Sequence, residues 1–486
     1  MENTSIDMEG IPMNKHTVVP QGGYLYDLNI GESVEFQSRT GQKRRITLVA
    51  VHEQPDRVRG VIRFPRITVD VGGERADLVA ALYRLPSVVN GVKIGCSVTR
   101  SVALSNVGEY AMDKDARIRC WDPDAPFFGP QPMVYPVRQM WFVSKTQLGN
   151  EKTYALSGEL ELCGKSIYYH HGVDIMGYDK AVPVVAAVAG RVVQSRDERA
   201  DDEPQDTWPR GDNIGMVIIR DAAGWRYRYA HLDMIADSMR VGAMVAAGDL
   251  VGFMGKKGGS GGCTHLHFDI STIQAGGRRV SVEAYPFLVE AYLNEHPGVL
   301  LACARPHRAA AVGEPVELDA GASICGKGRI VGYEWRFHDG TTATGARATR
   351  TYDREGEYSE MVTVTDDRGR TDVDFCDVQI LPPDADPART PSIMAADYYP
   401  TENLRPGQPI AFKVRAHFGG RFAVNKGGEE RWDFGDGSHA TTCSDDEYAE
   451  RWHAYAKPGR YIVTVQRTAK NGISATVQLK VEIGNG

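Results

Sequence analysis

A group of histidines in three short motifs constrains the fold of this chain more than any other feature of its sequence. Catalytic zinc sites use three protein ligands and keep a fourth position open for water. Three side chains in these motifs suit such a site, and two further histidines remain for proton transfer. The fold must therefore bring together segments that lie far apart in the sequence. The motifs are His170-x-Gly172-x-Asp174, Tyr229-Ala230-His231-Leu232 and His265-Leu266-His267.

The last motif predicts an extended strand. Side chains two positions apart in a strand share one face and lie about 6.6 Å from each other. His265 and His267 can therefore point into one pocket, while Leu266 and Phe268 face the other way, into a hydrophobic core.

The first motif requires a bend in the backbone. In a straight strand His170 and Asp174 would be roughly 13 Å apart, too far to bind one metal ion. Gly172 lies between them and can adopt backbone conformations that other residues avoid. We expect a kink at Gly172, with Val173 turned into the core.

The three motifs, in this order, resemble those of the lysostaphin/LytM family of zinc endopeptidases, which cut peptides of bacterial cell walls. Residues 241–248 and 251–255 resemble the strand-turn-strand run that precedes the last motif in that family. The resemblance covers residues 136–298 and implies an antiparallel β-sheet domain.

The resemblance also implies a role for each of five side chains. By similarity, His170, Asp174 and His267 would hold Zn²⁺, which acidifies water and polarises a carbonyl group. His231 and His265 would be the catalytic histidines. One would take the proton of water and the other would hydrogen-bond the developing oxyanion, and the sequence leaves open which does which. Two alternatives are purely structural histidines and a LytM-like module that has lost its activity.

Two neighbouring residues could change this assignment. His171 could replace His170 as a ligand, but the fixed distance to Asp174 favours His170, and we expect His171 in the groove or on the surface. Asp269 would share a face with His267, where a carboxylate can orient a histidine ligand. We expect Asp269 instead at a solvated strand end.

Two loops are expected beside the zinc site. Residues 258–264 are rich in glycine, which predicts a flexible wall, and Cys263 within them is expected to be a small buried thiol. Residues 196–212 form a long charged insertion that either overhangs the groove and selects substrate or is a solvated loop.

The C-terminal part of the chain contains an internal repeat. A Trp-x-Phe-x-Asp-Gly motif begins at Trp335 and again at Trp432, and a Tyr-x-x-x-Gly-x-Tyr motif begins at Tyr352 and again at Tyr455. The Asp-Gly pairs predict tight turns, and the alternating runs that follow predict strands of two β-sandwiches. These units resemble PKD-type domains, immunoglobulin-like modules of extracellular enzymes. We expect both tryptophans in the cores, and the modules either act as spacers or bind cell-wall glycan or protein.

The N-terminal region carries no recognisable chemistry. It is either a β-rich docking domain or an inhibitory segment that lies across the zinc groove. An inhibitory segment would need a residue that reaches the open zinc position, and Asp113, Asp115 and Asp122 are candidates by residue type alone. We prefer to interpret these aspartates as parts of solvated turns. The pattern predicts a helix over 75–83 and strands over 33–37, 45–52, 59–71 and 92–101.

The whole chain of 486 residues is expected to be mainly β and multidomain. A net charge of −7 argues against general nucleic-acid binding. The expected domains are an N-terminal domain (1–135), a LytM-like zinc peptidase domain (136–298) and PKD-like sandwiches (299–384 and 385–486).

Location and cysteine pairing are less constrained. No apolar run is long enough for a membrane span, and residues 1–20 lack the apolar core of a signal peptide. The family nevertheless works outside the membrane, in an extracellular, periplasmic or cell-surface setting.

The eight cysteines have no zinc-ribbon or redox spacing. Cys96 with Cys120, or two among Cys303, Cys325 and Cys376, form disulfides, or all remain free thiols.

These features together predict a zinc endopeptidase acting on the stem peptide or cross-bridge of peptidoglycan. The alternatives are a zinc peptidase for other extracellular proteins and a catalytically silent cell-surface binding protein.

Overall fold

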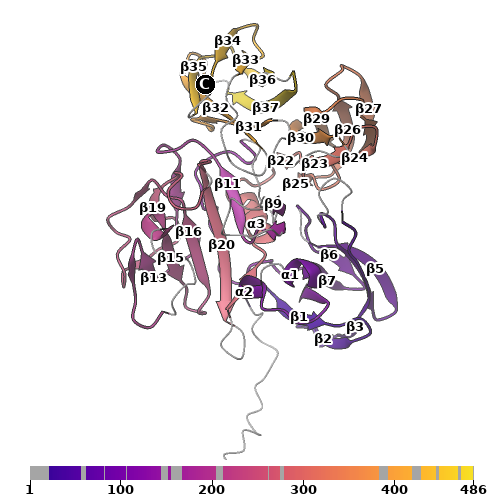
Figure 1. Cartoon of the computed structure of the whole chain (residues 1–486). Helices are drawn as coiled ribbons and strands as arrows, with labels where there is room; N and C mark the ends of the chain where they lie inside the picture. Colours follow the sequence, from indigo (N-terminus) through magenta and orange to yellow (C-terminus); the bar gives the residue numbers. More distant parts are fainter. Residues whose placement is uncertain are drawn as a thin grey trace, which may run out of the picture.

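The protein folds into a mainly β, multidomain structure, as expected. Figure 1, drawn from a computed structural model, shows the N-terminal region in indigo beside the central sheet, with two sandwiches above. The structure describes residues 21–55, 62–80, 83–104, 107–143, 152–154, 167–203, 212–260, 262–273, 279–382, 392–418, 428–444, 448–468 and 472–484.

The N-terminal region consists of two four-stranded antiparallel sheets that enclose one apolar core. The first has the order β1-β8-β7-β6, and the second β2-β3-β4-β5. Two short helices follow β7. The bounds are β1 Tyr24–Leu28, β2 Ser33–Gln37, β3 Lys43–His52, β4 Arg66–Val71, β5 Glu74–Val79, β6 Ser87–Val89, β7 Val92–Thr99, β8 Ala116–Trp121, α1 Arg100–Leu104 and α2 Val107–Tyr110.

The predicted helix over 75–83 is wrong, because its described part contains strand β5. Gly72 and Gly73 have φ of +58° and +96° and form the tight turn of the β4–β5 hairpin. Pairing with β4 satisfies the backbone of β5 and outweighs the helix preference of its alanine and leucine. β4 also begins later than predicted, at Arg66.

The central region is built on one antiparallel sheet with the strand order β11-β20-β16-β15-β13-β14. Two further strands extend this sheet, because β18 pairs with β13 and β21 pairs with β20. A three-stranded sheet, β12-β19-β17, and helix α3 pack with it around the largest apolar core. The bounds are β9 Lys152–Tyr154, β10 Ile167–Tyr169, β11 Val173–Met176, β12 Pro183–Val185, β13 Gly190–Ser195, β14 Glu198–Arg199, η1 Asp212–Gly215, β15 Val217–Arg220, β16 Arg226–Ala230, β17 Met234–Ile235, β18 Met244–Val245, β19 Leu250–Phe253, β20 His265–Ile273, β21 Arg279–Val282 and α3 Tyr285–Glu295.

The C-terminal part consists of two β-sandwiches, each with its own apolar core. Trp335 and Trp432 are buried in these cores, as predicted. One sheet continues through both sandwiches, because β29 and β37 pair in parallel at Glu357 and Ala475. The first sandwich has β22 Leu300–Leu301, β23 Arg308–Ala311, β24 Pro315–Asp319, β25 Ile324–Cys325, β26 Ile330–Arg336, β27 Thr342–Thr344, β28 Arg347–Thr351, β29 Gly356–Asp366 and β30 Thr371–Leu381. The second has β31 Ser392–Tyr399, β32 Ile410–Phe418, β33 Glu429–Asp433, β34 His439–Thr442, β35 Ala449–His453, β36 Gly459–Thr468 and β37 Ser474–Ile483.

The cysteines that the structure describes are free thiols, so the free-thiol alternative holds for them. Cys96 and Cys120 are both buried, and burial raises the pKa of the Cys96 thiol to about 12.

Within the described ranges, no helix combines the length and the apolar character needed to cross a membrane.

Candidate metal centre

Two neighbouring strands bring the first and last motifs together. β11 pairs antiparallel with β20, so that Asp174 lies opposite His267 and Met176 opposite His265. The other edge of β20 pairs with β16, whose last residue, Ala230, also lies opposite His267. This register places His231, the residue after β16, beside the same end of the sheet. Directly opposed residues have Cβ atoms about 4.5–5.5 Å apart, close enough for their side chains to share a ligand.

The predicted kink at Gly172 is confirmed. Gly172 has φ of +73°, and β11 begins at the next residue, with Val173 fully buried. A Cβ atom on Gly172 would lie 2.7 Å from the Cβ of Asp269 and 2.8 Å from the carbonyl oxygen of Phe268. Only glycine fits this conformation in this space. The bend brings His170 back over β11.

Three donor atoms converge beyond the kink. His170 Nε2 lies 3.0 Å from His267 Nδ1 and 3.2 Å from Asp174 Oδ1, and His267 Nδ1 lies 2.9 Å from Asp174 Oδ1. Zinc–ligand bonds of about 2.0 Å in a tetrahedron separate neighbouring donors by about 3.3 Å. The triangle therefore fits a tetrahedral ion bound by two imidazoles and one carboxylate. The structure brings together all three residues predicted as ligands.

His231 and His265 face this triangle. Their ring centroids are 4.6 Å apart, and His265 Nε2 lies 3.7 Å from Asp174 Oδ1. Each Nδ1 lies within hydrogen-bond distance of a backbone carbonyl, Lys257 O at 2.7 Å for His231 and Cys263 O at 3.0 Å for His265. A carbonyl only accepts, so both Nδ1 atoms donate, which leaves each Nε2 available as an acceptor.

His231 has an unusual backbone conformation. Its φ is +66°, in the left-handed region that non-glycine residues rarely adopt. Such strain gathers at functional sites, where the surrounding structure enforces it. Here it ends β16 and turns the imidazole toward His265. Burial lowers the pKa of His231 well below its usual value, so its ring is neutral near pH 7 and its Nε2 is unprotonated.

A buried polar layer lies behind His267, where two sequence predictions fail. Asp269 is buried rather than at a solvated strand end, and His171 is buried rather than in the groove or on the surface. Asp269 Oδ2 lies 3.4 Å from His267 Nε2, so it can hold the proton on that nitrogen while Nδ1 faces the other ligands. The short turn at Gly172 carries His171 inward.

Arg228 completes this layer and was not predicted. Its Nη2 lies 3.0 Å from both His171 Nε2 and His267 Nε2, and its Nε donates to Asp269. His171, His267 and Asp269 are close enough to hold a metal of their own, but the guanidinium already supplies the positive charge there. A buried arginine needs a carboxylate partner, and only the register of β16 with β20 identifies Asp269 as that partner.

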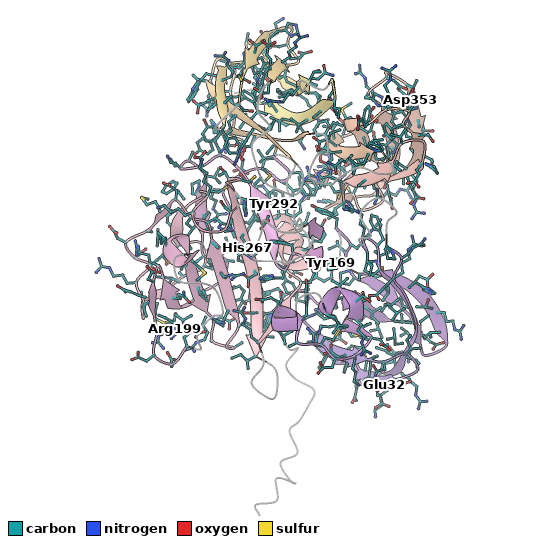
Figure 2. The ribbon with its side chains drawn as sticks, in the orientation of Figure 1. Glu32, Tyr169, Arg199, His267, Tyr292 and Asp353 are labelled. Atoms are coloured by element: carbon teal, nitrogen blue, oxygen red, sulfur yellow. The ribbon has the colours of Figure 1, made fainter. Side chains whose placement is uncertain are left out.

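The N-terminal region supports the first metal-ligand segment from its buried side. Tyr110 Oη donates to the carbonyl of His170 at 3.3 Å, and the amide of Ile62 donates to Tyr169 Oη at 3.0 Å. Figure 2 shows Tyr169 on the side of the central sheet that faces this region. Glu109 of α2 pairs with Arg279 and lies 3.7 Å from His171 Nε2. No sequence pattern indicated these contacts.

The aspartates considered as inhibitory residues have other partners. Asp122 is buried and accepts from Arg39, which contradicts the preferred interpretation of a solvated turn, and Asp115 accepts from the amide of Ile30.

The described part of the charged insertion folds onto its own sheet. Glu203 is buried against Arg226. Residues 204–211 of the insertion lie outside the described residues.

Comparisons with known proteins agree with this geometry. Residues 168–281 match the sequence model of peptidase family M23, and residues 299–380 and 394–483 match that of the PKD domain. The central region is therefore an M23-type peptidase domain, and PKD domains follow it. This confirms the resemblance to LytM-type peptidases with PKD-like domains that the motifs indicated.

Individual relatives match only parts of the chain. A microbial collagenase of Vibrio alginolyticus is 42% identical over 60 residues, 12% of this chain and 7% of that protein, and collagenase ColA of Clostridium perfringens is 28% identical over 92 residues, 19% and 8%. The likeness to collagenases comes through the PKD domains. Among solved structures, a Ruminococcus gnavus protein described as a LytM-type glycyl-glycine endopeptidase is 26% identical and covers 33% of this chain and 60% of its own, with a TM-score of 0.22. A catalytic-domain mutant of the prophage-encoded M23 protein EnpA of Enterococcus faecalis is 24% identical and covers 32% and 92%, with a TM-score of 0.18.

Proposed function

We propose that this protein is a zinc endopeptidase that hydrolyses peptide bonds in bacterial peptidoglycan. The observation that carries the proposal is the donor triangle of His170, Asp174 and His267, with two oriented histidines facing it. In this proposal those three residues hold Zn²⁺. When bound, zinc lowers the pKa of water and polarises the scissile carbonyl group.

His231 and His265 supply the proton chemistry. Each donates Nδ1–H to a backbone carbonyl and leaves Nε2 unengaged by that bond, and Nε2 of His265 lies 3.7 Å from Asp174 Oδ1. The one acting as base accepts the proton of the attacking water, and the other donates to the oxyanion that develops on the substrate. Burial lowers the pKa of both rings, so each is neutral near pH 7 and offers an unprotonated Nε2 to the water proton. The ring that donates to the oxyanion must carry a proton on Nε2 as well, as an imidazolium.

The M23 match and the domain composition support the proposed substrate class. Peptides of the wall stem or cross-bridge are the proposed substrates, at an extracellular, periplasmic or cell-surface location, and the PKD domains are proposed to contact wall glycan or protein. We also propose domain boundaries after residues 135, 298 and 384. A catalytically silent binding protein is the opposed hypothesis, and the complete donor set disfavours it.

Purified walls with different cross-bridges provide the test. The protein should contain one zinc per chain, clear a wall suspension and release fragments whose masses name the bond cut. Chelation should abolish clearing, and added zinc should restore it.

Two classes of variant separate the roles. His231→Ala should keep its zinc and lose clearing by about 100-fold or more, whereas His170→Ala should lose zinc and activity together. His439→Ala, a histidine of the second sandwich on β34, serves as the matched control and should behave as wild type. Loss of zinc in His231→Ala would refute the ligand assignment, and binding to walls without release of fragments would favour the silent binding protein.

A further inference from the structure

The second sandwich rests on the segment that leads into His265. Its contacts come from β32 and from the chain entering β35, where Lys413 lies opposite Glu450 in the sheet. Figure 1 shows β31, β32 and β35 above the ends of β11 and β20. The segment in contact is part of the glycine-rich run over 258–264, for which the sequence predicts a flexible wall.

Lys413 is the centre of this contact. Its Nζ donates to Asp179 Oδ1 at 2.6 Å and to Thr264 Oγ1 at 3.2 Å, both in the peptidase domain. The ammonium group also lies 4.7 Å from the ring centroid of Tyr178 and 4.5 Å from that of Tyr448. The side chain is only 2% exposed. Burying an ammonium costs several kcal/mol unless it is paired, and these groups from both domains provide the pairing.

Three further hydrogen bonds join the same surfaces. The amide of Thr264 donates to Tyr448 Oη at 3.3 Å, and Arg415 Nη1 donates to the carbonyl of Gly262. Tyr178 Oη donates to Glu450. The residues just before His265 are therefore fixed through both backbone and side chain.

This fixed segment sets the orientation of a proposed catalytic histidine. His265 Nδ1 donates to the carbonyl of Cys263, which lies between the anchored residues Gly262 and Thr264. That bond places the second proton-transfer position, Nε2, toward Asp174. A shift of the Cys263 carbonyl would release the ring to rotate.

We propose that the second sandwich is part of the catalytic unit, with Lys413 as a positioning residue that fixes Gly262–Thr264 and, through the Cys263 carbonyl, the His265 ring. This inference rests on the proposed function. It distinguishes the second sandwich from a tethered wall-binding module, whose loss would change wall binding but not the turnover of a small peptide.

Lys413→Met tests the proposal in the full-length protein, because it removes the ammonium and keeps an unbranched apolar side chain. The probes are two soluble peptides, an oligoglycine and a cross-linked stem peptide, together with amide hydrogen exchange over 262–266. We expect zinc content to be unchanged, kcat to fall at least about tenfold with little change in KM, and exchange at the Thr264 amide to accelerate.

Lys480→Met is the matched control. Lys480 is also a buried lysine of the second sandwich, but it pairs with Asp372 of the first sandwich, away from His265. This variant should keep wild-type kcat and wild-type exchange over 262–266. Asp179→Asn should also lower kcat, and the double variant should lose no more kcat than Lys413→Met alone, because the Lys413–Asp179 pair is already absent from that variant.

The outcomes separate the two proposals. A folded Lys413→Met protein with wild-type kcat and wild-type exchange over 262–266 overturns the positioning role. If wild type cleaves neither peptide nor walls, the proposed function fails, while hydrogen exchange still decides whether Lys413 fixes the segment. Should Lys413→Met not fold, Tyr448→Phe removes only the oxygen that accepts from Thr264 and must show faster exchange there for the proposal to stand.

Discussion

At the scale of single residues, three histidines of the site each face a specific acceptor. Backbone carbonyls hold His231 and His265, and the Asp269 carboxylate faces the remaining nitrogen of His267. An imidazole free to rotate would spend little time with the correct nitrogen toward a metal or a substrate. Groups of this kind therefore contribute to metal affinity and catalysis without touching the reacting atoms.

Asp269→Asn should weaken zinc binding. The amide cannot hold the proton of His267 Nε2 as a carboxylate does, and loss of such partners typically lowers metal affinity about 10–100-fold. Competition with a chromophoric chelator measures the affinity. Asp319→Asn is the control, because Asp319 is also buried and paired with an arginine, Arg84, but lies in the first sandwich. Equal zinc affinity in folded Asp269→Asn and Asp319→Asn proteins would contradict this role.

At the scale of elements, the site depends on one junction, between His170 and strand β11. The strand supplies Asp174 in register with His267, and the bend at Gly172 returns the preceding histidine to the same point. Because the glycine also lies against β20, the conformation and the close packing both exclude a side chain.

Gly172→Ala should lower both stability and zinc affinity. A left-handed conformation costs a non-glycine residue about 1–3 kcal/mol, and the contacts with Asp269 and Phe268 add to it. Gly224→Ala measures the conformational cost alone, since Gly224 has φ of +85° with nothing within 4 Å of the added atom. Thermal melting and zinc titration of both variants make the comparison. Equal losses in the two would show that close packing at Gly172 contributes nothing.

At the scale of the whole molecule, the flanking domains are built into the peptidase domain. The N-terminal region contacts the His170 segment, and the second sandwich contacts the residues before His265. Beneath the second contact, on β31, Asp397 is fully buried 3.7 Å from Lys413, and burial raises its pKa to about 7. Asp179 is therefore the ionised partner of Lys413, because its own pKa is lowered.

Asp397 should make stability depend on pH. The native protein holds this proton to a higher pH than the unfolded chain does, so the stabilisation is complete below about pH 4 and is lost as the pH rises through 7. Raising the pH from 5 to 8 should destabilise wild type relative to Asp397→Asn by roughly 3 kcal/mol. Calorimetric melting across this range measures it. Asp353→Asn, an exposed carboxylate labelled in Figure 2, should follow wild type. Parallel profiles of wild type and Asp397→Asn would refute the prediction.

The parts of the site that could be predicted were those set by local geometry. The alternation of His265 and His267 with two apolar residues gave their common face, and Gly172 between two ligand types indicated the bend. The helix expected over 75–83 failed because the strand pairing of β5 is decided by β4 and the turn at Gly72. Burial of His171 and Asp269 could not be predicted, since it depends on how Arg228 and α2 pack behind the sheet.

The sequence by itself determined which side chains can bind a metal, which faces they share along a strand, and that two repeated sandwiches follow. These properties depend on residue type and on spacing over a few positions. Only the tertiary structure decided that the three donor atoms meet within about 3 Å and that the guanidinium of Arg228 lies among the side chains behind His267. It also decided that Lys413 reaches Thr264 across a domain boundary. Such contacts join residues that are remote along the chain, and strand register and domain packing, rather than local preference, bring them together.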